Sequence, residues 1–252
     1  LHTQRRRQRQ MCIRDRVSEL ESRITELSNN LAEAGIEAAL IQSPVDLYYY
    51  AGGRQNGALL IPAVDSAAST EQGGDGATFF VRRSVERAKF EAGADDSCLV
   101  IQKFPSLRIF AETLTNMGID GGIGLQLGEI PADFGQKFKS ALAPIGEGKD
   151  CTAIVHHQRE TKSDWELEMM REGAKVQRQM FEAVKQSVTI GATELDLVAA
   201  AEEVSRRHGF GGTVQMRRFP LQCDRAVIAS GRAGGAVSYT HLTLPTTLGV
   251  WG

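Results

Sequence analysis

Apolar residues recur at helical spacing in the first part of the chain. Leu20, Ile24, Leu27 and Leu31 lie three or four residues apart, which predicts one buried helical face that ends at Gly35. Further helices are predicted over about 84–91, 107–117 and 134–142, with a short aromatic turn or helix at 46–50. Short apolar runs predict strands at 38–41, 58–61, 78–81, 98–101, 123–127 and 152–155. Because strands alternate with helices, this pattern favours an α/β layer with a largely covered sheet.

The pattern changes after residue 162. Ser163 and Glu166 have the spacing of a capping box, which predicts a helix from there to about Ser187. Thr193 is predicted to cap a second helix that ends at Gly209, and strands are expected at 213–216 and 226–229. Residues 143–162 therefore indicate a boundary between an α/β domain and a second domain, so the chain as a whole is α+β.

The composition is that of an ordinary soluble globular protein. Of the 252 residues, 42% are hydrophobic and 24% are charged, and the formal net charge is −2. No apolar run approaches the length of a membrane span, so contact with a membrane is not expected. The four cysteines (12, 98, 151 and 223) lack the spacing of a zinc site or a disulfide framework. A reducing compartment, the cytoplasm, is the expected location.

The two ends differ from the rest of the chain. Residues 1–16 carry a charge of +5, and the remaining residues carry −7. The segments MCIRDR (11–16) and VSYTHLTLPTT (237–247) resemble translated sequencing-adapter stretches. We therefore expect residues 1–16 to be an artefactual or disordered arm and residues 237–252 to be an artefactual tail. On either interpretation the basic run does not indicate nucleic-acid binding.

Three stretches between these ends carry a family resemblance. The first is the helix and strand from Arg23 that lead into PVDLYYYAGG, the second is RETKSDWELEMMREGAKVQRQMFEAV (159–184), and the third is IGATELDLVAAAEEVSRRHG (190–209). In this order they resemble the Xaa-Pro aminopeptidase, Xaa-Pro dipeptidase and creatinase family. The resemblance implies a ribonuclease-H-like creatinase N-terminal domain over 17–150, followed by a truncated start of the pita-bread peptidase domain over 151–236.

The resemblance also implies a chemistry. Peptidases of this family hold two divalent metal ions (manganese, cobalt or zinc) with two Asp, one His and two Glu, and a metal-bridging hydroxide attacks the peptide bond. In the family these ligands follow the second catalytic helix, and we expect this chain to end before them. Asp224 has no partner carboxylate in the sequence that follows it. No catalytic or metal-ligating residue is therefore assigned, and no substrate-binding residue is identified.

The strand end after residue 229 departs from the family pattern. Ser230 and Gly231 match, but Ala233 stands where the family has Asn, Ser238 stands at the His position, and His241 is out of register. We predict a fragment of a Xaa-Pro-type metallopeptidase that is itself inactive. Two alternatives stay open: a non-catalytic pita-bread module that binds proteins, and a metal-free creatinase-like amidinohydrolase. Whether the parent protein is an enzyme is not decided. A peptide substrate and a homodimer are the expected partners of the parent, without nucleic acid.

Other polar residues have simpler interpretations than catalysis. His156 and His157 are predicted to flank a strand end, and His208 to lie near a helix C-terminus or in the core. Cys98 and Cys151 are predicted to be buried thiols, and Tyr48, Tyr49 and Tyr50 to be packing residues at the domain interface. The glycines at 121–124 lack the strand–loop–helix order of a phosphate loop. The apolar stripes of the helices after 162 are expected to be partly exposed, because most of their sheet is missing.

Overall fold

The computed structural model describes residues 2–53, 55–68, 76–92 and 97–210. The chain divides into two compact units, Leu1–Thr161 and Lys162–Gly252. Within the described residues, every helix is too short or too polar to cross a lipid bilayer. The strands predicted at 213–216 and 226–229, and Asp224, Ser230 and Ala233, lie outside the described residues.

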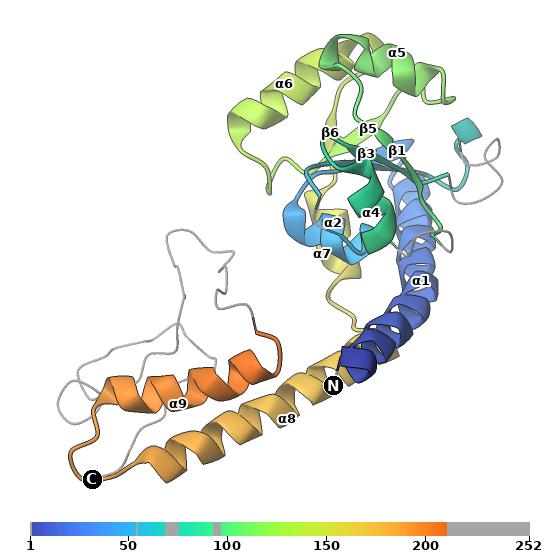
Figure 1. Cartoon of the computed structure of the whole chain (residues 1–252). Helices are drawn as coiled ribbons and strands as arrows, with labels where there is room; N and C mark the ends of the chain where they lie inside the picture. Colours follow the sequence, from blue (N-terminus) through green and yellow to red (C-terminus); the bar gives the residue numbers. More distant parts are fainter. Residues whose placement is uncertain (1, 54, 69–75, 93–96, 211–252) are drawn as a thin grey trace. The chain divides into compact units, whose positions relative to one another are not determined.

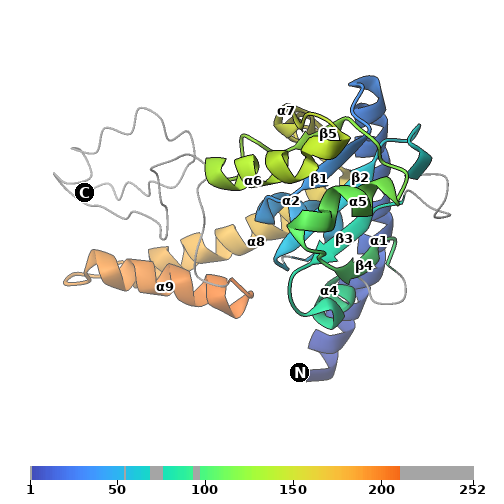
Figure 2. The ribbon, with the colours of Figure 1, turned by 90° about the horizontal axis from the view of Figure 1, so that it is seen from above.

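The first unit is built on a six-stranded mixed sheet in the order β4-β3-β2-β1-β5-β6 (Figures 1 and 2). The strands are β1 (Ala38–Ile41), β2 (Gly57–Pro62), β3 (Thr78–Val81), β4 (Val100–Lys103), β5 (Ile123–Leu125) and β6 (Lys149–Asp150). β1, β2 and β3 pair antiparallel, whereas β1–β5, β5–β6 and β3–β4 are parallel pairs. Parallel pairs need crossover connections, and these carry the helices that cover the sheet.

One face of the sheet is covered by four helices (Figure 1). They are α1 (His2–Glu33), α2 (Pro44–Ala51), α4 (Val85–Glu91) and α7 (Thr152–Gln158). The predicted stripe of α1 is confirmed, because Leu20, Ile24, Leu27 and Leu31 are all buried. Gly35 has a positive φ of 62°, as its predicted position after the helix end requires. This face holds the larger core cluster, to which β1 contributes its odd-numbered residues.

The opposite face is covered by the 3₁₀ turn η2 (Leu107–Ile109), α5 (Phe110–Thr115) and α6 (Ala132–Leu142), with η3 (Ala143–Ile145) after α6. Figures 1 and 2 both show α5 and α6 next to each other on this face. Its core is aromatic: the ring centroids of Phe80 and Phe110 lie 5.5 Å apart and those of Phe104 and Phe110 lie 5.2 Å apart. The sheet is thus covered on both faces, and the predicted α/β class is confirmed.

The described part of the second unit is a helix pair, α8 (Asp164–Ser187) and α9 (Glu194–Arg207). Both predicted caps are confirmed as capping boxes: Ser163 with Glu166, and Thr193 with Asp196. The buried apolar contact between the helices is small and consists of Val184, Leu197 and Ala201. Much of the remaining apolar surface of α8 is exposed, including 60% of Met170, as the sequence predicted.

Three predictions of local structure were wrong or shifted. Thr152–Val155 is the start of helix α7 instead of a strand. The Asp150 side chain accepts hydrogen bonds from the backbone N–H and the hydroxyl of Thr152, and so fixes the first helical turn. β4 begins at Val100 instead of Cys98, and β5 ends at Leu125 instead of Leu127. α1 begins at His2, and the artefactual or disordered arm expected over residues 1–16 stays a prediction.

Candidate functional site at the carboxyl ends of β1 and β5

The parallel strands β1 and β5 end side by side, because Leu40 and Leu125 are partners in the sheet. The next residue of β5, Gln126, is completely buried. Its Oε1 accepts hydrogen bonds from the backbone N–H groups of Gln42 (2.7 Å) and Ser43 (2.9 Å). Its Nε2 donates to Oδ2 of Asp46 at 2.7 Å. One side chain therefore joins the end of β1, the turn after it and the first turn of α2.

Asp46 is a buried carboxylate with both oxygens occupied. Its side chain is 1% exposed, and Oδ1 accepts a hydrogen bond from Nη1 of Arg159 at 2.7 Å. Arg159 follows the last residue of α7 and is 32% exposed. A buried carboxylate without partners would be strongly destabilising, so the pair with Arg159 and the bond from Gln126 are what allow Asp46 to lie here. The pair holds α7 against α2.

A second buried bond lies beside this pair. The hydroxyl of Tyr50 donates to Oε1 of Gln158 at 2.8 Å, and Nε2 of Gln158 donates to the backbone oxygen of Arg23 at 2.8 Å. Burial raises the pKa of Tyr50 well above its ordinary value, and the nearby Tyr49 and Asp46 raise this pKa further. Tyr50 is therefore held as a neutral hydrogen-bond donor, and α7 is tied to α1 as well as to α2.

The three consecutive tyrosines have different environments. Tyr50 is buried, and Tyr49 lies against two guanidinium groups, with Cζ of Arg23 and Cζ of Arg159 at 3.9 Å and 5.6 Å from its ring centroid. Tyr48 is 48% exposed. Tyr49 and Tyr50 thus pack inside the first unit, by cation–π contact and hydrogen bonding. Their predicted place at a domain interface stays a prediction.

The side chain of Gln42 is an exception in this polar region. Gln42 is only 7% exposed, but neither its amide oxygen nor its amide nitrogen has a hydrogen-bond partner in the described part of the chain. An unsatisfied buried amide costs about 1–3 kcal/mol. The rest of the core must offset this cost.

The two neighbouring histidines are separated by the structure. Nε2 of His156 lies 2.9 Å from Oε1 of Glu129, and both side chains are largely buried. His157 is exposed and its Nδ1 lies 3.3 Å from Oε2 of Glu160. They lie in helix α7 and do not flank a strand end, so that prediction was wrong. His208 is exposed at the C-cap of α9, with Nε2 2.9 Å from Oε1 of Gln179.

The thiol of Cys151 is poorly suited to chemistry. Cys151 is completely buried, and burial, with a smaller contribution from Asp150, raises its pKa to about 12. Cys98 is only half-buried, so the prediction of a buried thiol holds for Cys151 alone. A thiol becomes a nucleophile when its pKa is lowered, and the environment of Cys151 does the opposite.

Asp150 has a structural use at the end of β6. Burial raises its pKa, but hydrogen bonds from the side chain and backbone of Thr152 and from the backbone of Leu127 outweigh this effect, so the pKa is lowered. The oxygen Oδ1 receives all three bonds. This carboxylate therefore joins the turn after β5 to the start of α7.

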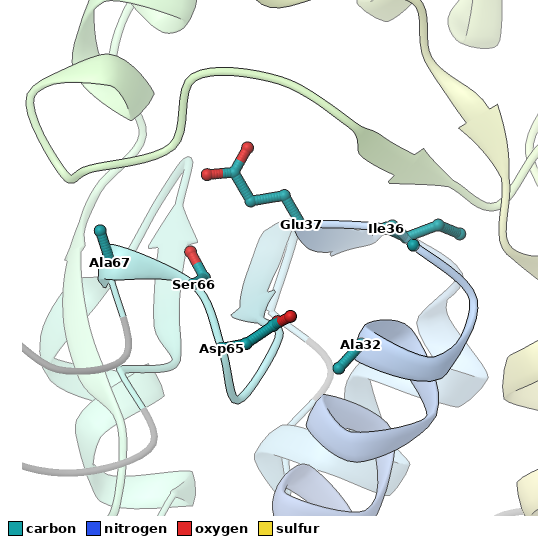
Figure 3. Close-up of a pocket in the computed structure, with 7 residues that line it drawn as sticks. Ala32, Ile36, Glu37, Asp65, Ser66 and Ala67 are labelled. Atoms are coloured by element: carbon teal, nitrogen blue, oxygen red, sulfur yellow. The ribbon is translucent and has the colours of Figure 1, made fainter.

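A hollow of about 260 Å³ lies elsewhere in the first unit, at the C-terminal end of α1 (Figure 3). Its walls include the acidic residues Glu37 and Asp65. Oε2 of Glu37 accepts a hydrogen bond from the backbone N–H of Gly121 at 2.8 Å, so this carboxylate already fixes the turn before β5. Gly122 in this turn has a positive φ of 60° and leads into a strand, as expected for a turn that is not a phosphate loop.

The described residues do not fit a metal centre. Within 2–53, 55–68, 76–92 and 97–210, no three His, Cys, Asp or Glu side chains gather closely enough to hold a metal ion. The carboxylates of Asp46 and Asp150 at this site already accept hydrogen bonds, which come from Arg159, Gln126, Thr152 and Leu127. What this arrangement does is hold α2 and α7 to the sheet.

The residues of this site were not predicted from the sequence. Asp46, Gln126, Gln158 and Arg159 were not singled out for a role, although Asp46 and Arg159 stand within two of the stretches that carried the family resemblance. The usable signal was an acid in the first turn of an otherwise apolar helix. Its partner is 113 residues away, which no local pattern reveals.

A comparison of the sequence with known families defines the class of this protein. The sequence profile of the Creatinase/Prolidase N-terminal domain matches residues 23–161, which is more than half of the chain. The chain belongs to the creatinase/prolidase family, as the resemblance indicated. The profile ends where the first compact unit ends.

Individual relatives agree with this family. The chain is 24% identical over 193 residues to the Xaa-Pro dipeptidase of Pyrococcus furiosus, which is 75% of this chain and 49% of that protein. The solved Xaa-Pro dipeptidase from Bacillus anthracis matches with a TM-score of 0.59 and 21% identity, over 75% of this chain and 50% of the other. The prolidase from Pyrococcus horikoshii matches with a TM-score of 0.56 and 19% identity, over 75% and 49%. The structures show a shared fold, and the chain spans about half the length of these relatives.

Proposed function

We propose that this chain is the N-terminal part of a Xaa-Pro-type metallopeptidase, an enzyme that hydrolyses peptide bonds next to proline. The observation that carries the proposal is the extent of the similarity to the Pyrococcus furiosus Xaa-Pro dipeptidase. It covers 193 residues, so it is longer than the N-terminal domain profile over 23–161. The similarity therefore includes part of the region after the N-terminal domain, where the peptidase domain of the proposed parent begins.

The proposed domain roles follow from this assignment. Residues 17–150 form the creatinase-type N-terminal domain, residues 151–236 begin the pita-bread domain, and residues 1–16 and 237–252 belong to neither. The compact units divide after Thr161, so α7 packs with the N-terminal domain. Gln158 and Arg159 then act as structural residues that join α7 to the N-terminal domain.

The two divalent metal ions of the proposed parent, manganese, cobalt or zinc, have no set of ligands among the described residues. We assign them to a part of the parent that is not in this sequence. The expectation is that the 252-residue chain alone does not hydrolyse peptides. We further propose that the parent is a homodimer in the cytoplasm and that it does not bind nucleic acid.

The test is to measure metal content and peptide hydrolysis for the purified 252-residue chain and for a version extended along its natural gene. The extended protein should retain divalent metal and release proline from an X-Pro dipeptide, and the short chain should do neither. The Pyrococcus furiosus Xaa-Pro dipeptidase serves as the positive control. Hydrolysis by the short chain would contradict the inactivity proposal, and an extended protein that binds metal but leaves the dipeptide intact would contradict the peptidase proposal.

One sequence feature favours a second candidate, a non-catalytic protein-binding relative. Ala233 stands where the family has Asn, next to the expected substrate-binding end of a strand. A metal-free extended protein with no hydrolysis of X-Pro dipeptides would support this candidate. Hydrolysis of creatine by the same metal-free protein would instead support the creatinase-like amidinohydrolase.

A further inference from the structure

The two edges of the sheet differ in how well they are closed. β6 is only two residues long, and the chain enters α7 directly after Cys151. The opposite edge is β4, whose four residues pair only with β3 among the residues that the structure describes (Figure 2). Three of these four residues are exposed, and Ile101 is half-buried. An edge strand with unpaired backbone groups is a template for pairing with another strand.

The hydrogen bonds of β4 show which backbone groups point outward. The N–H of Val100 donates to the oxygen of Ala77 at 3.0 Å, and the N–H of Phe104 donates to the oxygen of Val81 at 2.9 Å. Because alternate residues of a strand face opposite neighbours, Gln102 also faces β3. The N–H and C=O groups of Ile101 and Lys103 must then point away from the sheet, at its open edge.

We propose that this edge pairs antiparallel with β4 of a second copy of the chain, around a two-fold axis at Gln102. In this register Ile101 of each copy lies opposite Lys103 of the other, and each of these pairs exchanges both backbone hydrogen bonds. Gln102 lies opposite Gln102 of the second copy in a non-hydrogen-bonded pair. The result is one continuous sheet through both copies, with a self-complementary interface.

The side chains of β4 favour a second copy of the chain as the partner that pairs with this edge. Val100, which is 47% exposed, comes opposite Phe104 of the second copy, so two apolar side chains meet on one face of the extended sheet. On the other face the aliphatic stem of Lys103 covers Ile101. The register shifted by one pair toward the C-terminus would place Lys103 against Lys103, and like charges directly opposite are destabilising. The strand therefore matches itself in the proposed register.

The homodimer is part of the proposed function, and the β4 edge would be the surface through which its two copies bind. Failure of this inference is separable from failure of the peptidase proposal, because hydrolysis and metal content play no part in its test. A chain that does not pair at β4 would leave the proposed reaction untouched.

The first test is a disulfide across the axis. Gln102→Cys, made in a Cys98→Ser background, places two thiols at a non-hydrogen-bonded antiparallel pair, where the Cα atoms are about 4.5 Å apart and a disulfide fits. After mild oxidation of the 252-residue chain, peptide mapping should find position 102 linked to position 102. Glu112→Cys in the same background, an exposed position on α5, is the matched control and should give no such self-linked peptide.

The second test uses proline to remove single backbone donors. Lys103→Pro removes an outward N–H and should convert the dimer to a monomer in analytical ultracentrifugation, with little change in melting temperature. Gln102→Pro removes an inward N–H and should lower the melting temperature, because it breaks the ladder with β3. If the 252-residue chain without substitutions is monomeric at micromolar concentration, the inference is overturned. A dimer that lacks the 102–102 link and is unaffected by Lys103→Pro would overturn it as well.

Discussion

Helices α1 and α8 carry apolar stripes of the same period, but the stripe of α1 is buried and most of that of α8 is exposed. Leu27 and Leu31 of α1 are 0% exposed because a sheet face lies beneath them. In α8 only Val184 is buried, and its contact is with α9. The difference teaches that periodicity determines which face of a helix is apolar, whereas the free energy depends on what covers that face.

The largest effect is expected from truncating one side chain on each stripe. Leu27→Ala should lower the free energy of unfolding by about 3 kcal/mol, since it removes buried methyl groups and leaves a cavity. Met170→Ala should change it by less than about 0.5 kcal/mol, because this side chain is already 60% exposed. Urea unfolding followed by circular dichroism measures both. Equal losses would mean that α8 is covered in solution.

The next effect concerns ion pairs in the two units. Arg159→Met leaves the buried carboxylate of Asp46 without its charged partner. The expected loss is about 2 kcal/mol, below the usual ~3–5 for fully buried pairs because Arg159 is partly solvated. Arg171→Met breaks the exposed pair with Glu168 and should cost less than about 1 kcal/mol. Urea unfolding gives both values. A larger loss of unfolding free energy for Arg171→Met than for Arg159→Met would reverse the comparison.

A smaller effect is expected at the start of α8. Ser163 accepts a hydrogen bond from the backbone N–H of Glu166, and Ser163→Ala should cost about 1 kcal/mol of local helix stability. Amide hydrogen exchange in the first turns of α8 should become faster. Ser187→Ala at the other end removes only a bond to the oxygen of Ala183 and is the control. Unchanged exchange after Ser163→Ala would show that α8 is held by something other than its cap.

The smallest effect is a pH dependence confined to the first unit. Because the pKa of Tyr50 is raised in the folded state, the folded chain keeps a proton that the unfolded chain loses above about pH 10. Stability from this group is complete below that pH and is lost as the pH rises. Tyr50→Phe should flatten the fall in unfolding free energy between about pH 9 and pH 11. Tyr48→Phe, at a half-exposed ring, should leave the slope as it is.

Much of the first unit could be predicted from local patterns, but the start of α7 could not. The stripes of α1 and α6 and the strands β1, β2 and β3 follow from side-chain spacing and apolar runs. The run Thr152–Val155 is too short to separate strand from helix by composition, and the carboxylate of Asp150 decides for the helix. Local patterns identify apolar faces well, but they do not report a polar partner that caps a turn.

The candidate site could not be predicted for a related reason. Asp46, Gln126 and Arg159 are distant in sequence, and only the parallel pairing of β1 with β5 and the packing of α7 bring them together. Burial of a carboxylate is unfavourable by itself, so Asp residues are rarely fully buried without a partner. The long-range partners are what allow Asp46 to be buried.

The place of β1 in the sheet has a consequence for synthesis on the ribosome. Its partner β2 follows closely, but Leu40 pairs with Leu125 on its other side. At ~5–20 residues per second, roughly 4 to 17 s pass between the translation of these two residues. During that interval the hydrogen-bonding groups on one side of a fully apolar strand are open to other nascent chains. A chaperone that captures early translation products would find its binding segment here.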